Sequence, residues 1–110
     1  MSYRYDLMID QGATFALDIE CQDEDATPLD LSGYSASAQI RYKLSDPAPA
    51  AVFSAVVVPA LGVVSLSLGA AQTSALNRTQ GFWDCELTAP DGTVQRLASG
   101  RVGVSPEVTR

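Results

Sequence analysis

A chain of 110 residues, 46% of them hydrophobic, is long enough for one domain with its own core and too apolar for a disordered segment. A net charge of −6 without clustered Lys and Arg argues against binding to nucleic acid or to an anionic membrane, because phosphate contacts need clustered bases. His is absent, which removes the commonest general base and the commonest metal ligand. We therefore expect a single domain over residues 1–110 that is not an enzyme and holds no cofactor.

The most apolar region, residues 50–68, does not read as a membrane span. Ser, Pro and Gly interrupt it, whereas a span needs about 20 consecutive apolar residues. Near the N-terminus, Asp6 and Asp10 lie where a secretory signal would be apolar. We expect a protein that stays in the cell that makes it, or that leaves as part of an assembly.

The charges are unevenly distributed along the chain. Residues 1–30 contain eight acids and one base, Arg4, for a net charge of −7, whereas residues 31–110 have a net charge of +1. Two interpretations are open, namely docking of the acidic end of one copy on the basic part of a neighbour, or a solvated acidic surface. The second is the usual meaning of a run of like charges, and we favour it at this point.

Two strands are expected in the first quarter of the chain. Tyr3 to Asp10 should form the first, and Gln11-Gly12 the bend after it. From Thr14 to Gln22 apolar and polar residues alternate, which predicts a strand with one buried and one wet face, typical of an antiparallel sheet. A charged turn follows at residues 23–28.

The next segment connects that turn to a third strand. Its expected contacts with the core are Leu29, Leu31 and Tyr34. Residues 36–43 alternate again and should form the third strand. Residues 45–50 contain two prolines, which interrupt regular pairing, so a loop is predicted.

The middle of the chain predicts two short strands and a helix. The strands are Val52 to Val58 and Val63 to Leu68, with a tight connection at residues 59–62. Residues 69–76 have the only helix-forming content. Because two turns are too short to be stable alone, they are expected to form a short helical crossover between sheets.

The last third predicts a hairpin that holds the only Trp. In residues 81–88 the side chains of Trp83, Cys85 and Leu87 fall on one face. Pro90 and Gly92 suit the turn, and the following strand should run back antiparallel.

In that final strand, residues 93–104, the alternation of apolar and polar residues shifts by one position. Leu97 is out of step with Val102, and Gly100 lies between them, so we expect a β-bulge at Gly100. In total, seven or eight short strands with turns every 8–14 residues indicate an all-β protein, an antiparallel sandwich of two sheets.

Cys21 and Cys85 are both expected on buried faces. Their separation, with an aromatic residue two places before the second, resembles the pair that bridges the sheets of immunoglobulin domains. A disulfide needs an oxidising compartment, which no signal peptide indicates here. Buried free thiols are therefore the favoured interpretation.

Candidate chemical sites are few. Trp83 alternates with apolar residues, which favours core packing over stacking on a sugar or base. Phe82 lies on the other side of the same strand and is a candidate for contact with a partner.

An oxygen-ligand metal site would use Asp23, Glu24, Asp25 and Asp30, but their spacing does not match an EF-hand, and a solvated loop is favoured.

Several segments together resemble small virion proteins of tailed bacteriophages and prophages, and also the N-terminal domain of phage baseplate upper proteins. The segments are Tyr5-Asp6-Leu7-Met8-Ile9-Asp10-Gln11-Gly12-Ala13-Thr14-Phe15, Asp30-Leu31-Ser32-Gly33-Tyr34-Ser35-Ala36, Ile40-Arg41, Asp84-Cys85-Glu86-Leu87-Thr88, Pro90-Asp91-Gly92-Thr93-Val94 and Val102-Gly103-Val104-Ser105-Pro106-Glu107-Val108-Thr109-Arg110. The resemblance implies an immunoglobulin-like sandwich in the tail, baseplate or fibre-attachment region of a virion. It implies no catalytic or ligand residues. The implied partners are other virion proteins and copies of the chain itself in a symmetric assembly.

The expected docking residues are those that the core pattern does not use. They are Met1, Ser2, Tyr3, Arg4, Asp46, Pro47, Ala48, Pro49, Phe82, Ser105, Pro106, Glu107, Val108, Thr109 and Arg110. Two other functions stay open, a head decoration protein on the capsid surface and a carbohydrate-binding sandwich that uses Phe82, Trp83 or Tyr42.

Overall fold

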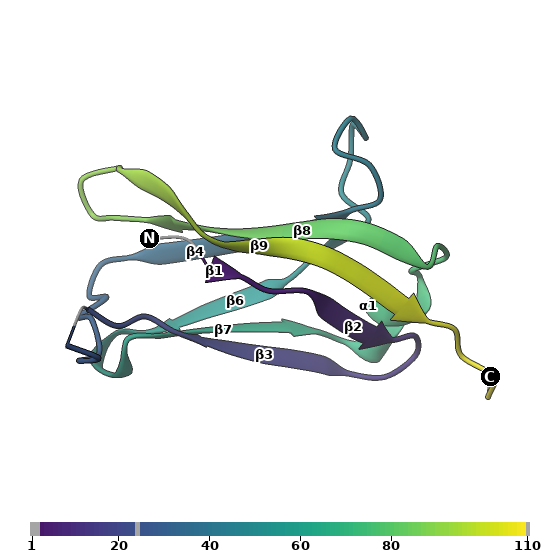
Figure 1. Ribbon diagram of the computed structural model, residues 1–110, viewed down its shortest axis with the longest axis horizontal. Coiled ribbons are helices and arrows are strands. Elements are labelled where there is room, and N and C mark those ends of the chain that lie inside the picture. The colour runs from purple at the N-terminus through teal and green to yellow at the C-terminus, as the bar shows by residue number, and fades with distance from the viewer. Residues whose placement is uncertain (1–2, 24, 110) are drawn as a thin grey trace.

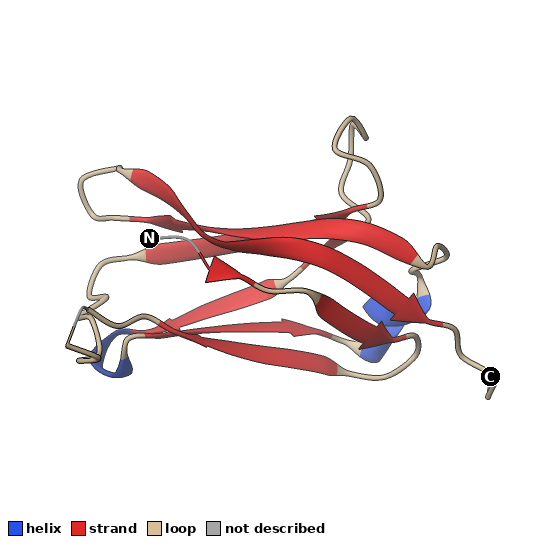
Figure 2. Cartoon of the chain, in the orientation of Figure 1, coloured by secondary structure: helices blue, strands red, loops and turns tan. Residues whose placement is uncertain are grey.

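The computed structural model describes residues 3–23 and 25–109, which fold into two facing β-sheets (Figures 1 and 2). We call the layer drawn above in Figure 1 the large sheet and the layer below it the small sheet. The large sheet has strand order β1-β9-β8-β4-β5, with β2 also paired to β9, and the small sheet has order β3-β7-β6. The strands are β1 (Tyr3–Arg4), β2 (Leu7–Asp10), β3 (Phe15–Glu20), β4 (Ser35–Arg41), β5 (Ala51–Val52), β6 (Ser54–Val58), β7 (Val63–Leu68), β8 (Gln80–Thr88) and β9 (Val94–Ser105).

The expected alternation explains which side chains are buried. In β8 the burial follows period two, with Trp83, Cys85 and Leu87 inside and their neighbours toward solvent. The buried hydrophobic residues form one cluster to which both sheets contribute, for example Ile40 from β4 and Leu66 from β7. The predicted all-β architecture with two layers is confirmed for the described residues.

The first expected strand, residues 3–10, is in fact two strands, and both run parallel to β9. Tyr3 pairs with Ala98 in β1, and Leu7 pairs with Val102 in β2. The expectation of a wholly antiparallel sandwich is therefore wrong at the N-terminus. Between the two strands the Asp6 side chain accepts a hydrogen bond of 3.0 Å from the Arg101 backbone N–H, so a carboxylate occupies the place of a ladder carbonyl.

The expected strand Val52 to Val58 is also two strands, and they belong to different sheets. β5 pairs with β4 in the large sheet, and β6 pairs with β7 in the small sheet. The change occurs at Phe53, which is 4% exposed and whose ring lies 6.2 Å from those of both Phe15 and Trp83. Burying this ring between the layers turns the chain from one sheet to the other. These two divisions give nine strands in the part of the chain that the structure describes, where seven or eight were expected.

The connections were largely predicted. The helix α1 (Ala70–Ser74) links β7 to β8 and so crosses between the sheets, as expected for residues 69–76. A 3-10 helix, Pro59–Leu61, makes the tight turn between β6 and β7. Of the three expected core contacts in the connection before β4, Leu31 is buried and Tyr34 packs on the core, but Leu29 is exposed.

The bulge lies two to three residues earlier than expected. Cys85 of β8 pairs with Ala98 and Glu86 pairs with Arg96, so Leu97 is the extra residue in β9. Leu97 and Ala98 are both buried because the bulge turns two successive side chains inward. Gly100 pairs regularly with Trp83, and its role is different, since a Cβ there would overlap the Tyr5 carbonyl oxygen.

Candidate functional site

The outer side of the large sheet carries a row of three side chains at its centre. Arg41 of β4 pairs with Phe82 of β8, and Phe82 pairs with Arg101 of β9. Paired residues of neighbouring strands have their side chains on the same face, so Arg41 and Arg101 lie on either side of Phe82. Phe82 is 39% exposed, although the other aromatic residue of the strand, Trp83, is buried. An exposed aromatic ring between two arginines has the composition of a protein-binding surface.

Two further arginines and an exposed leucine surround this row. Arg4 of β1 pairs with Ser99 of β9. Arg96 lies three residues before Ser99 in β9. Together with Leu44 they line a depression of about 350 Å³ on this side of the sheet. We call this surface the arginine face and define it by Arg4, Arg41, Leu44, Phe82, Arg96 and Arg101.

Two carboxylates, Asp6 and Asp84, lie near the arginine face, and each forms an ion pair at its margin. Arg4 contacts Asp6 at 3.5 Å, and Arg96 contacts Asp84 at 3.7 Å. These are the only two ion pairs among the described residues, and neither includes Arg41 or Arg101. Exposed pairs of this kind contribute about 0–1 kcal/mol each, so they do not prevent Arg4 or Arg96 from contacting a partner.

The proline loop, residues 43–50, borders the arginine face and stands away from the large sheet (Figure 1). Arg41 holds the loop in place, because its Nη1 donates a hydrogen bond of 2.7 Å to the Asp46 carbonyl oxygen. The Asp46 carboxylate in turn accepts a bond of 3.1 Å from the Lys43 backbone N–H. Pro47 and Ala48 are exposed at the loop, and Pro49 is half-buried.

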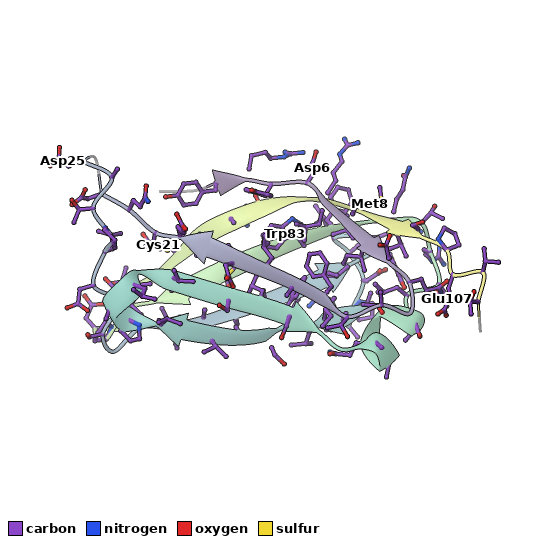
Figure 3. The ribbon with its side chains drawn as sticks, turned by 90° about the horizontal axis from the view of Figure 1, so that it is seen from below. Asp6, Met8, Cys21, Asp25, Trp83 and Glu107 are labelled. Carbon is purple, nitrogen blue, oxygen red and sulfur yellow. The ribbon has the colours of Figure 1, made fainter. Side chains whose placement is uncertain are left out.

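The predicted docking residues therefore fall into two groups. Arg4, Phe82 and the proline loop meet at the arginine face. Ser105 and the segment from Pro106 to Thr109 lie at the opposite end of the long axis from Asp25, as the position of Glu107 in Figure 3 shows. Met1, Ser2 and Arg110 lie outside the described residues.

The chain ends are more engaged with the fold than the core pattern indicated. Tyr3 is half-buried and packs on the core, and Ser105 closes the β9 ladder opposite Asp10. The Glu107 backbone N–H donates a bond of 2.8 Å to the Gln11 side chain, whereas Val108 is 92% exposed. Within the described tail, the freely accessible part begins after Glu107.

Sequence reasoning missed Arg41, Arg96, Arg101 and Leu44 as members of the candidate site. A signal for two of them was present. Arg41 follows Gln39 on the wet side of its strand, and Arg101 falls between buried Gly100 and Val102. Alternation assigns each to the outer face, but it carries no information on which strand is the lateral neighbour.

Trp83 and Tyr42, two of the three aromatic candidates for sugar binding, make contacts within the protein. Trp83 is 3% exposed, and its Nε1 donates a hydrogen bond of 2.7 Å to the Tyr5 carbonyl oxygen, so the predicted core role is confirmed. The Tyr42 hydroxyl accepts a bond of 2.9 Å from the Asn77 backbone N–H, and the Arg78 guanidinium lies 5.7 Å from the Tyr42 ring centre. Phe82 alone of the three is left on an open surface.

The two cysteines are free and buried, as the sequence interpretation favoured. Burial, together with the negative charges of nearby Asp84, Cys21 and Glu86, raises the pKa of Cys85 to about 12. Burial also raises the pKa of the Cys21 thiol. A thiol held protonated in this way is a weak nucleophile and a weak metal ligand.

The acidic loop, residues 22–30, is shaped by local hydrogen bonds to two of its carboxylates, Asp23 and Asp30, and Asp30 accepts bonds from the Ser32 N–H at 3.0 Å and the Ser32 hydroxyl at 2.6 Å. The Asp23 Oδ1 accepts bonds of 2.9 Å and 3.0 Å from the Asp25 and Thr27 backbone N–H groups. Glu24 lies outside the described residues. Among residues 3–23 and 25–109, His, Cys, Asp and Glu form no group of three that could hold a metal ion.

None of the helices formed by the described residues has the length and apolar character needed to cross a membrane.

No protein-family model matches the chain, and a search among curated proteins finds no match.

Proposed function

We propose that this chain is a non-enzymatic structural protein of a tailed-phage virion, and that it acts in the tail, baseplate or fibre-attachment region as a protein–protein docking module. The observation that carries the docking role is the arginine face, in which Phe82 is exposed between Arg41 and Arg101. The place in a virion rests on the resemblance of the sequence segments described above. The implied partners are other virion proteins and copies of the chain.

The docking role follows from the chemistry of this face. Aromatic residues and arginine are enriched among the residues that dominate interface energies, and a ring that is open to solvent gains most when a partner covers it. Burying a Phe side chain contributes about 1.5–3 kcal/mol relative to leaving it exposed. Within residues 3–23 and 25–109, no carboxylate lies within ion-pair distance of Arg101, although Asp6 is near enough to interact with its charge, and Arg101 offers a planar set of donors to a partner.

We also infer that the two sheets have immunoglobulin-like connectivity. The order β3-β7-β6 matches strands B, E and D of such domains, and the order β9-β8-β4 matches G, F and C. The N-terminal strands depart from the constant-type order, because β1 and β2 pair with β9 instead of β3. An experimental structure in which β3 is hydrogen-bonded to a strand of the large sheet would overturn this inference.

The proposed function is tested in particles purified by density gradient from bacteria that carry the gene with its phage or prophage. Phe82→Ser removes the exposed ring, and the matched control Leu61→Ser removes a large exposed residue from the turn between β6 and β7. We expect the wild-type and Leu61→Ser chains to co-sediment with particles, and Phe82→Ser to be depleted at least tenfold by quantitative mass spectrometry. Thermal unfolding of both variants controls for folding.

Cryo-electron microscopy of the same particles assigns the location. Density for the chain in a ring of the tail or baseplate is the expected result. Density that follows the symmetry of the capsid would replace the proposal with head decoration. A chain that never co-sediments with particles would overturn a virion role altogether.

Carbohydrate binding has weaker support, since only Phe82 of the three candidate aromatic residues is open. We expect no signal on a glycan array. A glycan whose binding is lost in Phe82→Ser and kept in Leu61→Ser would favour this function over docking.

A further inference from the structure

The uneven charge along the sequence becomes a difference in charge between the two sheets. No Lys or Arg occurs between Arg4 and Arg41, so the charged side chains of β3 and the acidic loop are all carboxylates. β6 and β7 carry no charged residue. Every base among the described residues therefore belongs to the large sheet or to its connections, and four of the chain's six arginines lie on the arginine face.

The acidic loop and the arginine face are separated within one molecule. In Figure 1 the loop lies at one end of the small sheet. The arginine face, by contrast, is on the outer side of the large sheet. Figure 3 shows Asp25 at the tip of this loop, pointing away from the body. The loop of one molecule therefore does not neutralise the arginines of the same molecule.

We propose that the arginine face binds the acidic loop of a second copy of this chain. The loop supplies a carboxylate from Asp25 that can form an ion pair with Arg101, and apolar surface for Phe82 and Leu44 from the exposed Pro28 and Leu29. The depression of about 350 Å³ between Phe82 and Leu44 provides the space that the tip of the loop enters. The inference rests on the docking role proposed above and names the partner.

Contacts of this kind are heterologous, because two different surfaces of the same chain meet. Repeating such a contact gives a ring if the rotation closes and a filament if it does not. The acidic loop that each added copy leaves free is available to the arginine face of the next. This charge distribution thus favours an assembly in which successive copies are joined head to tail.

The test uses the purified chain at several concentrations in 50 mM and 500 mM NaCl. Backbone amide shifts in 15N–1H spectra and sedimentation velocity report self-association, even where it is weak. We expect amides of Phe82, Arg101 and Asp25 to shift together as concentration rises, and amides of the β6 edge to stay unchanged. Higher salt should weaken association, since it shortens the range of interactions between exposed charges.

Charge reversal identifies the two surfaces. Arg101→Glu and Asp25→Arg should each lower the association constant at least tenfold when the variant is alone. An equimolar mixture of the two should associate again, because the acidic loop of the first variant meets the intact face of the second. The matched controls are Arg78→Glu and Asp10→Arg, which change the net charge equally at exposed positions outside both surfaces.

Loss of association in both variants and its return in the mixture supports the inference. An unchanged association constant in either variant, an equal loss in the controls, or no association at any concentration overturns it. Incorporation of the non-associating wild-type chain into particles would leave the docking role intact with a different partner. An acidic peptide from another virion protein that binds the wild-type chain but not Arg101→Glu would then identify that partner.

Discussion

The indole nitrogen of Trp83 donates a hydrogen bond of 2.7 Å to the backbone carbonyl of Tyr5, 78 residues earlier in the chain. Tyr5 lies between β1 and β2, where the N-terminal segment leaves the ladder of β9, and its own N–H donates to the Ser99 carbonyl at 2.9 Å. A buried side chain of β8 thus holds the N-terminal segment on the large sheet. The donor and the acceptor satisfy each other where water has little access.

Replacing Trp83 with Phe removes this donor and leaves the Tyr5 carbonyl without its partner. We expect a loss of about 1–3 kcal/mol in the free energy of unfolding, measured by urea denaturation. The N-terminal strands should be affected more than the rest, so amide exchange in β1 should accelerate more than in β4. Uniform acceleration across the large sheet would show that the bond has no special role in holding the N-terminus.

Gly100 is required because the Tyr5 carbonyl oxygen occupies the position of its missing side chain. In Gly100→Ala the added methyl meets rigid backbone, and such overpacking typically costs about 1–3 kcal/mol. Gly69→Ala is the matched control, since the nearest atom to a Cβ there is the Gln72 Oε1 at 3.8 Å. Equal melting temperatures for the two variants would contradict the close approach of the N-terminal segment to β9.

Thr73 is the buried polar residue that joins α1 to the turn between β2 and β3. Its Oγ1 accepts a bond of 3.0 Å from the Gly12 N–H and lies 2.9 Å from the Ala13 carbonyl oxygen, to which it donates. Thr73→Val keeps the shape but leaves both groups unpaired, and we expect a loss of about 1–3 kcal/mol. Thr73→Ser keeps the hydroxyl and should lose clearly less in chemical denaturation.

The carboxyl of Asp6 should make stability depend on pH in the acid range. The hydrogen bond from the Arg101 backbone N–H lowers the pKa of Asp6 below its ordinary value of 3.8, and the nearby Arg4 acts in the same direction. A lowered pKa in the folded state means that the charged carboxylate favours folding, so the contribution is present above pH 3.8 and is lost as the pH falls below it.

The variant Asp6→Asn isolates this contribution. At pH 7 it should unfold at a lower denaturant concentration than the wild type, and the difference should shrink as the pH is lowered toward 2. Asp10→Asn, a substitution at the exposed end of β2, serves as the control. A difference that is constant from pH 7 to pH 2 would contradict the assignment.

The two thiols should be protected in the folded protein. With a pKa of about 12, the Cys85 thiol at pH 8 has a thiolate fraction on the order of one in ten thousand, far below that of a free cysteine. We expect a chromogenic disulfide reagent at pH 8 to label neither cysteine in native buffer and both in 6 M guanidinium. Rapid labelling of Cys85 in native buffer would show that the sheets open readily.

Because the pKa of Cys85 is raised, the stability of the fold should fall as the pH rises through the alkaline range. Ionisation is easier in the unfolded chain than in the folded one, so the contribution of the buried thiol is complete below the ordinary cysteine pKa of 9.0. It is lost as the pH rises from 9.0 toward about 12. Cys85→Ala should therefore show a smaller loss of stability than the wild type between pH 8 and pH 11.

Local patterns predicted the features that depend on neighbours in the chain. The alternation around Trp83 identified the buried face of β8, and that around Ile19 identified the buried face of β3, because period two alone decides which side of a strand a residue occupies. The short crossover helix and the proline loop were predictable for the same reason. Each depends on a few adjacent residues with restricted backbone conformations.

The sequence by itself determined where most strands lie, which of their faces are buried, and that Phe82 lies on the outer side of β8, but not the division of residues 3–10 and 52–58 into two strands each. Only the tertiary structure decided which strands became neighbours. It turned the chain at Phe53, paired β2 with β9, and set Arg41 and Arg101 on either side of Phe82. Lateral order arises from contacts between residues tens of positions apart, and an alternating pattern is the same whichever strand lies beside it.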